Sequence, residues 1–271
     1  AVIFPFLLLP HVGIVRAALG MGFLNLLVAG VLVKRFRREL GRGARALGCV
    51  VVAGGAALGA SFFWSNSLVS FFEDRVYQDD IICVRNTPYQ HVVVTRWRDD
   101  VRLYLDGHLQ FSSVDEYRYH ESLVHPAMSA ALRRDNVLIL GGGDGLAARQ
   151  VLKYPDVQRV DVVDIDAVVT DLFTETELLA SLNEGAFREP RVHVYNRDAM
   201  NYLEQTNRLY QVVILDLPDP SSTQLAKLYS KSFYRLLGKH LAKGAAVGAQ
   251  CTSPFRSREA FWCIVHTMEA G

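Results

Sequence analysis

Acidic residues end several of the short apolar segments in the second half of this chain. The segment LILGGGDG leads through glycines to Asp144, and VVDID places Asp164 at the end of the next apolar segment. Asp198 follows a third segment, and Asp216 and Asp219 lie in VVILDLPDP. In a doubly wound sheet, ligands bind in the crevice outside the carboxyl ends of the strands, so these acids are expected to meet there. A crevice rich in carboxylates suits a nucleoside together with a positively charged substrate.

The glycine-rich turn differs from a dinucleotide-binding turn by its aspartate. In a dinucleotide fingerprint, backbone N–H groups approach a phosphate, which a carboxylate at the same place would repel. Asp144 instead suits a cation such as the free amine of an aminopropyl chain, and it disfavours a donor that keeps its own carboxylate. The turn alone indicates little, because any tight strand-to-helix turn can require glycines with positive φ.

The other acids have candidate roles in binding a nucleoside and an amine. Asp164 stands where an acid accepts hydrogen bonds from ribose hydroxyls, and Asp198 is placed to receive an adenine amino group. Either acid alone is more often an ordinary helix N-cap, but the two together at the expected strand ends, after a glycine-rich turn, favour an adenosyl site. Asp216 and Asp219 can bind an ammonium group, and one of them can take a proton as the amine attacks. The alternative for this pair is a strand-end turn with one Asx hydrogen bond.

Composition excludes several function classes. The 271 residues carry a formal net charge of +1, which provides no global basic field for nucleic acid. The four cysteines show no CxxC and no metal-ligand spacing, so we expect buried thiols in a reducing compartment and no metal site. Basic residues concentrate in KRFRRELGRGAR, residues 34–45. The expected partners are therefore small molecules and a lipid bilayer, and not nucleic acid.

Two apolar segments lie near the start, at residues 14–33 and 46–64. Each is about as long as the ~20 residues of a membrane-spanning helix, and the glycines and alanines of the second suit close helix packing in lipid. We predict that residues 1–70 form membrane helices of a multi-pass protein of the cell membrane. The alternative is a buried helical hairpin of a soluble domain. Because the chain begins within an apolar stretch, we expect further membrane helices before it.

The basic loop complicates the orientation in the membrane. By the positive-inside rule, residues 34–45 lie in the cytoplasm. One crossing by residues 46–64 would then place the following domain outside, whereas a domain that uses an adenosyl donor needs the cytoplasm. We expect a cytoplasmic catalytic domain. Two explanations remain open: the second segment re-enters on the same side, or the loop charge does not set the orientation.

The rest of the chain is predicted to form a connector and two further parts. Residues 71–80 are expected to be an amphipathic connector, and residues 81–118 a small antiparallel β-hairpin domain with a two-residue turn at Asp106-Gly107. From residue 119 to 271, alternating strand-like and helix-like segments predict a Rossmann-like, doubly wound, mostly parallel sheet whose C-terminal end we expect to be missing. The strand-like segments are 137–140, 160–165, 192–195, 212–216 and 245–250, and a last helix covers about 257–268.

A series of motifs occurs in order between about residues 89 and 254. The motifs are YQ (89–90), LYLDGHLQ (103–110), DEYRYHE (115–121), GGGDG, VVDID, RDA (197–199), LDLPDP and LYSKSFY (228–234). In this series the chain resembles the polyamine aminopropyltransferases, the spermidine synthase family, and in particular their membrane-anchored bacterial branch. The resemblance implies a sheet of the class I adenosylmethionine-dependent transferase type. It also implies transfer of the aminopropyl group of decarboxylated S-adenosylmethionine, as a co-substrate, to a diamine such as putrescine, giving spermidine and methylthioadenosine.

The resemblance further implies roles for individual residues, with no tightly bound cofactor, no metal, and a homodimer or higher oligomer. Asp216 would be the proton acceptor. Asp164 stands where the family usually has Glu, and the loop after Asp219 is longer than in the soluble enzymes. The amine substrates would contact Tyr119, His120, Asp144 and Asp219, of which Tyr119 and His120 line the diamine channel. The donor would contact Gln90, Gly142, Gly143, Asp144, Asp164, Ile165, Asp198 and Ala199, with Gln90 and Asp164 at the ribose and Asp198 and Ala199 at the adenine.

Two other functions fit parts of the pattern. An S-adenosylmethionine-dependent methyltransferase uses the same kind of sheet, but its donor would bring a carboxylate near Asp144, which is unfavourable. A non-catalytic, membrane-linked polyamine or nucleoside sensor would bind cations. Cation binding alone, however, requires no particular base geometry such as the one expected of Asp216 with Asp219.

Overall fold

The chain divides into two compact units. In this computed structural model, the described residues are 14–64, 77, 79–220 and 223–271. The first unit comprises Ala1–Asp99 and Leu105–Gly107, and the second comprises Asp100–Tyr104 and His108–Gly271. Most of the predicted connector, residues 71–76 and 78, lies outside the described residues.

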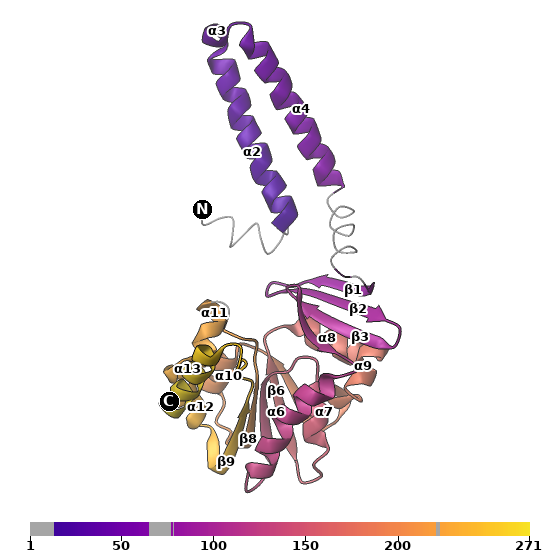
Figure 1. The fold of residues 1–271 in the computed structure, drawn as a ribbon, viewed down its shortest axis with the longest axis vertical. Coiled ribbons are helices and arrows are strands. Elements are labelled where there is room, and N and C mark those ends of the chain that lie inside the picture. The colour runs from indigo at the N-terminus through magenta and orange to yellow at the C-terminus, as the bar shows by residue number, and fades with distance from the viewer. Residues whose placement is uncertain (1–13, 65–76, 78, 221–222) are drawn as a thin grey trace. The chain divides into compact units, whose positions relative to one another are not determined.

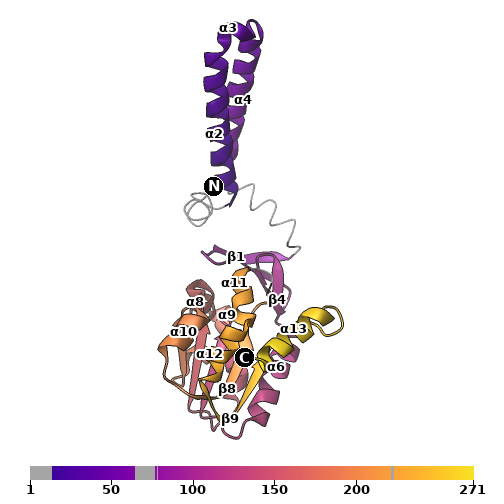
Figure 2. The same cartoon turned by 90° about the vertical axis from the view of Figure 1, so that its left-hand side faces the viewer.

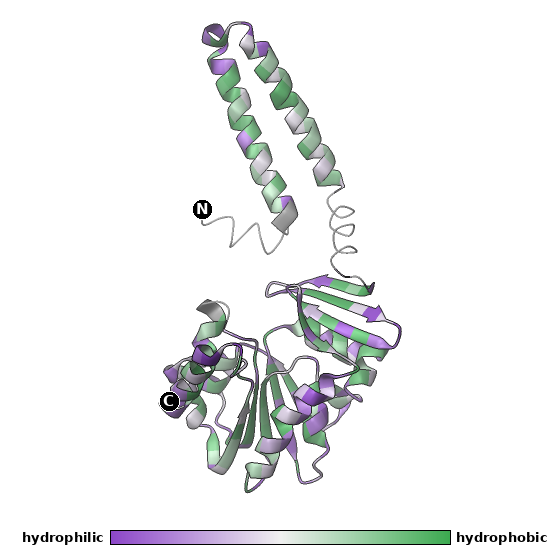
Figure 3. Ribbon diagram, in the orientation of Figure 1, coloured by the Kyte–Doolittle hydropathy of each residue, from purple (hydrophilic) through white to green (hydrophobic). Residues whose placement is uncertain are grey.

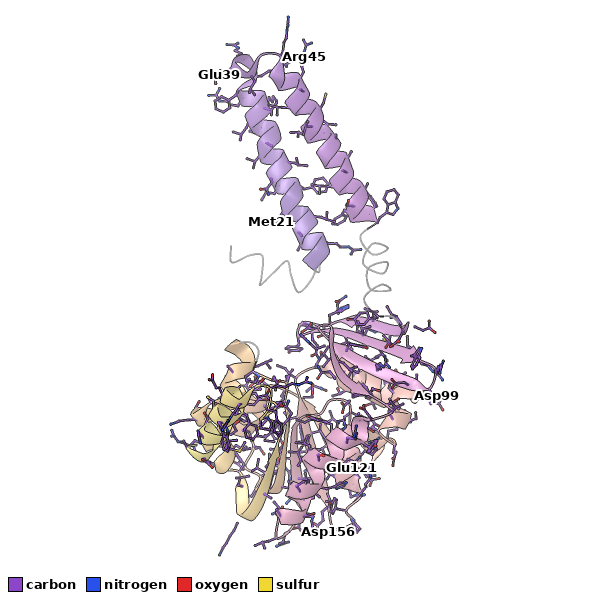
Figure 4. All side chains as sticks on the ribbon, in the orientation of Figure 1. Met21, Glu39, Arg45, Asp99, Glu121 and Asp156 are labelled. Carbon is purple, nitrogen blue, oxygen red and sulfur yellow. The ribbon has the colours of Figure 1, made fainter. Side chains whose placement is uncertain are left out.

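The first unit contains an apolar helical hairpin. Helices α2 (Ile14–Arg35) and α4 (Gly43–Phe63) are joined through the short helix α3 (Arg37–Leu40). Figure 4 shows Glu39 and Arg45 at the turn of this hairpin. Hydrophobic residues run along both long helices (Figure 3), and by length and composition each is a candidate membrane span.

Small residues allow α2 and α4 to approach each other. A Cβ added at Gly22 would meet the Leu58 side chain at 3.1 Å, and one at Gly54 would meet the Leu26 side chain at 3.3 Å. Close approach at glycines is typical of helices that pack in lipid. Within the described residues the apolar windows of these helices are 6% and 0% buried, so most of their apolar side chains are exposed.

Four strands form a small antiparallel sheet in the order β1-β2-β3-β4. The predicted turn at Asp106-Gly107 joins the last two strands, and both of its residues have positive φ, 51° and 80°, as a type I′ turn requires. The Asp106 carboxylate accepts a hydrogen bond of 2.8 Å from the backbone N–H of His91. The strands are β1 (Asp80–Asn86), β2 (His91–Trp97), β3 (Asp100–Leu105) and β4 (His108–Ser112).

Five parallel strands form the second sheet, in the order β7-β6-β5-β8-β9. The predicted doubly wound, Rossmann-like sheet is therefore confirmed, and its strand order reverses between β5 and β8. Such a reversal is the switch point at which ligands bind in open α/β sheets. The strands are β5 (Asn136–Gly141), β6 (Arg159–Asp164), β7 (Val192–Asn196), β8 (Tyr210–Asp216) and β9 (Leu241–Ala249).

Helices follow the strands of this sheet and cover both of its faces (Figures 1 and 2). Helix α6 leads into the first strand of the sheet, and α13 follows the last. The α-helices are α6 (Glu116–Ala130), α7 (Leu146–Leu152), α8 (Ala167–Glu175), α9 (Glu177–Leu182), α10 (Ala199–Gln205), α11 (Thr223–Ala226), α12 (Lys231–Gly238) and α13 (Arg258–Glu269). Two short 3₁₀ helices, η2 (Ala186–Arg188) and η3 (Lys227–Tyr229), complete the set.

The hydrophobic core lies on both sides of the parallel sheet. Along β5, Val137 and Ile139 pack into one cluster with residues of α6 and α7. Leu138 and Leu140 pack into a second cluster with residues of α10 and α12. Because successive side chains of a strand point to opposite faces, a sheet covered on both sides requires the uninterrupted apolar runs seen in this sequence.

Glycine is required at the end of β5, where the backbone passes close to β8. Gly141 has a φ of 85°, and its register partner on β8 is Asp216. A Cβ at Gly141 would collide with the backbone carbonyl oxygen of Asp216. Because Gly141 has no side chain, the start of the glycine-rich turn can lie directly against the strand that ends in Asp216.

We expect Gly141→Ala to lower the free energy of unfolding by more than about 1 kcal/mol, because alanine resists the left-handed backbone and meets β8. Thermal melting of the protein in detergent measures the effect. Gly238→Ala is the matched control, since a Cβ at this helical glycine has no neighbour within 4 Å. Equal melting temperatures for the two variants would contradict this account of the turn.

Candidate active site

The switch point brings together residues that are far apart in the sequence. Asp144 lies in the turn after β5, and Asp216 is the last residue of β8. The neighbouring helix α6 contributes Tyr119 and His120, and it packs against β8, β9 and α7. These four predicted site residues therefore come together on one side of the second unit.

Tyr119 is tied directly to the predicted base. Its hydroxyl donates a hydrogen bond of 2.6 Å to Oδ1 of Asp216. The tyrosine is 40% exposed as a whole. Burial of its hydroxyl and then the charge and hydrogen bond of Asp216 raise the pKa of Tyr119 well above its ordinary value, so the phenol stays protonated as a donor.

His120 is buried, at 2% exposed. Its Nδ1 lies 2.8 Å from Oε2 of Glu116, one helical turn earlier on α6. The other oxygen of Glu116 accepts a hydrogen bond of 2.6 Å from Arg149 of α7. Burial lowers the pKa of His120, but the hydrogen bond to Glu116 and the charges of Asp144 and Asp216 raise it above its ordinary value.

Asp144 is a carboxylate held in an unfavourable environment. Burial raises its pKa to about 6, with the positive charge of His120 lowering it and the negative charge of Asp216 raising it. Its Oδ1 accepts a hydrogen bond of 2.9 Å from the backbone N–H of Leu146, at the start of α7. Such a group gains from a cationic ligand, because a nearby positive charge favours its ionised form.

Asp164 closes on the glycine-rich turn from the end of β6. Its Oδ2 accepts a hydrogen bond of 3.0 Å from the N–H of Gly143, and a Cβ at Gly143 would lie 2.7 Å from that oxygen. Burial raises the pKa of Asp164 to about 6, while a hydrogen bond from the N–H of Asp166 lowers it and the charges of Asp166 and Asp144 raise it. The N-cap of α8 is Asp166 rather than Asp164, which leaves Asp164 without that structural role. Ile165, beside it, is 41% exposed.

Asp198 is the N-cap of α10, which is the structural role that the sequence also allowed for this residue. Its side chain accepts hydrogen bonds from the N–H groups of Met200 and Asn201. Its Oδ2 lies 2.5 Å from Nζ of Lys227. Burial raises the pKa of Asp198, but the hydrogen bond from Lys227 holds it below its usual range. The next residue, Ala199, is buried at 7% exposed.

Asp219 lies three residues beyond Asp216 in the loop after β8 and is exposed. Its Oδ1 accepts a hydrogen bond of 3.1 Å from Nε2 of Gln250, which follows β9. The hydroxyl of Tyr229 donates to the carbonyl oxygens of Leu217 and Pro218 in the same loop. The loop that carries Asp219 is therefore fixed from two neighbouring elements.

Two further residues that are predicted to contact the adenosyl donor have different surroundings. Gly142 lies in the glycine-rich turn with a φ of 68°, and a Cβ there would be 3.4 Å from Oδ2 of Asp216. Gln90 belongs to the first unit, in the turn between β1 and β2, where its N–H donates a hydrogen bond of 3.0 Å to Oγ1 of Thr87. Its contact with a ribose stays a prediction.

Sequence reasoning missed several residues that hold the site together. An open pocket of about 460 Å³ beside Tyr119 is lined by the end of β4 and the start of α6, with Glu116 in its wall. Glu116 could have been found from its spacing, since residues four apart on a helix are neighbours and His120 is one of them. Arg149 and Lys227 reach the site only through tertiary packing.

In the described part of the chain, no group of three or more His, Cys, Asp or Glu residues is arranged to hold a metal ion.

Comparison with known proteins agrees with this geometry. The sequence profile of the spermine/spermidine synthase domain matches residues 116–270, which include α6 and all five parallel strands. The chain belongs to the spermidine synthase family. The polyamine aminopropyltransferase 2 of Ralstonia nicotianae is 46% identical over 100% of this chain, which covers 54% of that protein. The polyamine aminopropyltransferase of Oceanobacillus iheyensis is 45% identical over 99% of this chain, which covers 52% of that protein.

A crystal structure of a spermidine synthase in complex with the transition-state analogue AdoDATO has the same fold. It superposes with a TM-score of 0.66 at 25% sequence identity, covering 70% of this chain and 64% of that chain. This chain spans about half the length of the family members that it matches in sequence. The family assignment rests on the match over residues 116–270, which contain α6, the five parallel strands and the turn that carries Asp144.

The raised pKa of Asp144 makes a prediction for stability. A carboxyl group with a folded-state pKa of about 6 and an ordinary value of 3.8 destabilises the ligand-free fold increasingly as the pH rises between these values. We expect Asp144→Asn to melt at a higher temperature than the unsubstituted protein above pH 6, with the difference shrinking toward pH 4. Thermal melting across this pH range checks the trend, and a difference independent of pH would contradict it.

Proposed function

We propose that the protein transfers the aminopropyl group of decarboxylated S-adenosylmethionine to a diamine such as putrescine, giving spermidine and methylthioadenosine. The single observation that carries this proposal is the meeting of Asp144, Asp216, Tyr119 and His120 at the switch point of the sheet. Two carboxylates on either side of the crevice suit two cationic reactants, one bearing a primary amine beside a sulfonium and the other a diamine. Membership of the spermidine synthase family supports the same reaction.

The proposed step is a direct displacement at the methylene carbon next to the sulfonium. The nitrogen of the diamine forms the new C–N bond with its lone pair, and the C–S bond breaks with its electrons passing to sulfur. The attacking nitrogen is an ammonium group at neutral pH, so it must lose a proton, which Asp216 accepts. The sulfonium is already a good leaving group. The main tasks of the protein are therefore alignment of the two reactants and removal of this proton.

Tyr119 supports the base in this scheme. Its hydroxyl holds Oδ1 of Asp216 at 2.6 Å, which leaves Oδ2 available to the ammonium group. Asp219, fixed by Gln250, would bind the same substrate through its charge. Asp144 would bind the amine of the aminopropyl group, and its raised pKa fits a site that is completed by a cation.

The nucleoside would lie along the ends of β5, β6 and β7. Asp164 would accept hydrogen bonds from the ribose, and Ile165 with the glycines Gly142 and Gly143 would line this part of the site. Asp198 would accept the adenine amino group next to Ala199. Lys227 now occupies Oδ2 of Asp198 at 2.5 Å, so the lysine has to yield this oxygen or share it when the nucleoside binds.

The methyltransferase alternative is less favourable for an electrostatic reason. A donor with its own carboxylate would place that group near Asp144, which already lies within the influence of Asp216. Binding of the decarboxylated and the carboxylated donor, compared on the same preparation, separates the two functions. A sensor, in contrast, would bind both polyamine and nucleoside without forming methylthioadenosine.

We expect Asp216→Asn to lower kcat for methylthioadenosine formation by about 10²- to 10⁴-fold, the range typical of a lost general base. Incubation of the purified protein with decarboxylated donor and putrescine, followed by chromatography of methylthioadenosine, measures the rate. Asp171→Asn, an equivalent substitution at an exposed position of α8, is the control and should retain full activity. Normal product formation by Asp216→Asn would remove this residue as the base.

The proposal includes a membrane anchor and a cytoplasmic catalytic part. Two apolar helices with exposed surfaces, α2 and α4, support insertion into a lipid bilayer, and the cationic loop between them suits anionic headgroups. A homodimer or higher oligomer, implied by the family, belongs to the same proposal. The adenosyl donor is a cytoplasmic metabolite, so the second unit has to face that compartment.

We expect the protein to remain in the membrane pellet after extraction with alkaline carbonate, because two spanning helices are buried in hydrocarbon. A protein held only by charge would instead be released by high salt. The expected burial of the thiols is wrong, because Cys49 and Cys263 are exposed. In a Cys49→Ala background, Cys263 of α13 should react with an impermeant maleimide only after the cells are opened. Labelling of Cys263 in intact cells would contradict the cytoplasmic orientation.

A further inference from the structure

Behind His120 lies a buried ion-pair network that the proposed reaction does not explain. Glu116 has a side chain only 8% exposed, and it contacts His120 through one carboxylate oxygen and Arg149 through the other. Arg149 also donates a hydrogen bond of 2.5 Å to the carbonyl oxygen of Leu182. A buried charge pair is costly to desolvate and is by itself weak evidence for a stabilising role.

The network fixes which nitrogen of His120 carries a proton. Nδ1 lies 3.0 Å from the backbone carbonyl oxygen of Glu116 and 2.8 Å from its Oε2. A carbonyl oxygen can only accept a hydrogen bond. The Glu116 carboxyl also stays an acceptor, because burial raises its pKa but the hydrogen bonds with His120 and Arg149 hold it below the usual range. Nδ1 must therefore be the donor in both charge states, and Nε2 is the nitrogen that titrates.

We propose that Glu116, held by Arg149, is a positioning residue that fixes the ring and tautomer of His120, so that neutral Nε2 accepts a hydrogen bond from an ammonium group of the diamine. This inference rests on the proposed function. It assigns to Glu116 an action through His120 and no contact with the substrate. Arg149 keeps the carboxylate in place from α7, which begins directly after the turn that carries Asp144.

Protonation of Nε2 turns the acceptor into a donor and adds a positive charge beside the substrate. The charged and titratable groups around His120 are Glu116 and Tyr119 on α6, Arg149 on α7, Asp144 after β5 and Asp216 on β8. The carboxylates among them stabilise the imidazolium when the site is empty. Diamine and proton therefore compete for the same carboxylates, and diamine binding should weaken as the pH falls.

The test compares Glu116→Gln with the unsubstituted protein in steady-state assays of methylthioadenosine formation from pH 6 to pH 9. We expect kcat/KM for putrescine to fall by about tenfold at pH 8, a typical loss for a partner that orients a site residue, while the KM of the donor stays within twofold. The acid limb of the putrescine profile should move to lower pH, because the imidazolium loses one stabilising charge. Glu121→Gln, the same substitution on α6 (Figure 4) at a side chain that is 44% exposed, is the matched control.

A double variant separates the action on His120 from a direct effect on Asp144, which also feels the charge of Glu116. In a His120→Asn background, Glu116→Gln should cause no further loss and no further shift, because coupled residues are not additive. Additive losses, a shift that persists without His120, or equal effects on both substrates would overturn the proposal. If Glu116→Gln fails to fold, Glu116→Asp replaces it, because it keeps the charge on a shorter side chain. Its kcat/KM for putrescine should lie between the values of the unsubstituted protein and of Glu116→Gln. A wild-type protein that forms no methylthioadenosine would instead refute the proposed function.

Discussion

Electrostatic repulsion between carboxylates at the switch point is the constraint on which this structure depends. Asp144 and Asp216 approach one another where β5 and β8 end, and Asp164 stands beside them at the end of β6. Burial and mutual repulsion raise the pKa of Asp144 and Asp164, so the ligand-free fold bears a cost in this region. A cationic ligand at the proposed site would relieve that cost, because a nearby positive charge favours the ionised form of a carboxyl group.

A second buried carboxylate in the same sheet shows the opposite solution. Asp161 on β6 is 0% exposed, and it accepts hydrogen bonds from Arg159, Tyr202 and Tyr210. Buried charges are tolerated when they are paired and hydrogen-bonded, and this one lies among the apolar residues of the core as a structural element. For Asp144, in contrast, the hydrogen bond described is a single backbone N–H. Three side-chain donors compensate the charge of Asp161, whereas the single backbone donor of Asp144 leaves a gain for a cationic ligand.

The cationic side chains near the site are also paired with carboxylates. Glu116 and Arg149 compensate each other beneath His120, so neither adds a free charge to the crevice. Lys227 pairs with Asp198, which follows β7. The site thus keeps its unpaired negative charge where amines are proposed to react, while the charges around it are neutralised by neighbours.

The sequence by itself determined the alternation of strands and helices, the turn at Asp106-Gly107 and the acids at the strand ends, because these depend on local periodicity and on backbone preferences. It also fixed the two apolar helices, whose length and composition are local properties. Only the tertiary structure decided which acids come close together and which cap a helix, as Asp198 does for α10. It also decided that Arg149 reaches Glu116 and that Lys227 reaches Asp198, because such contacts join elements whose distance in space cannot be read from their spacing along the chain.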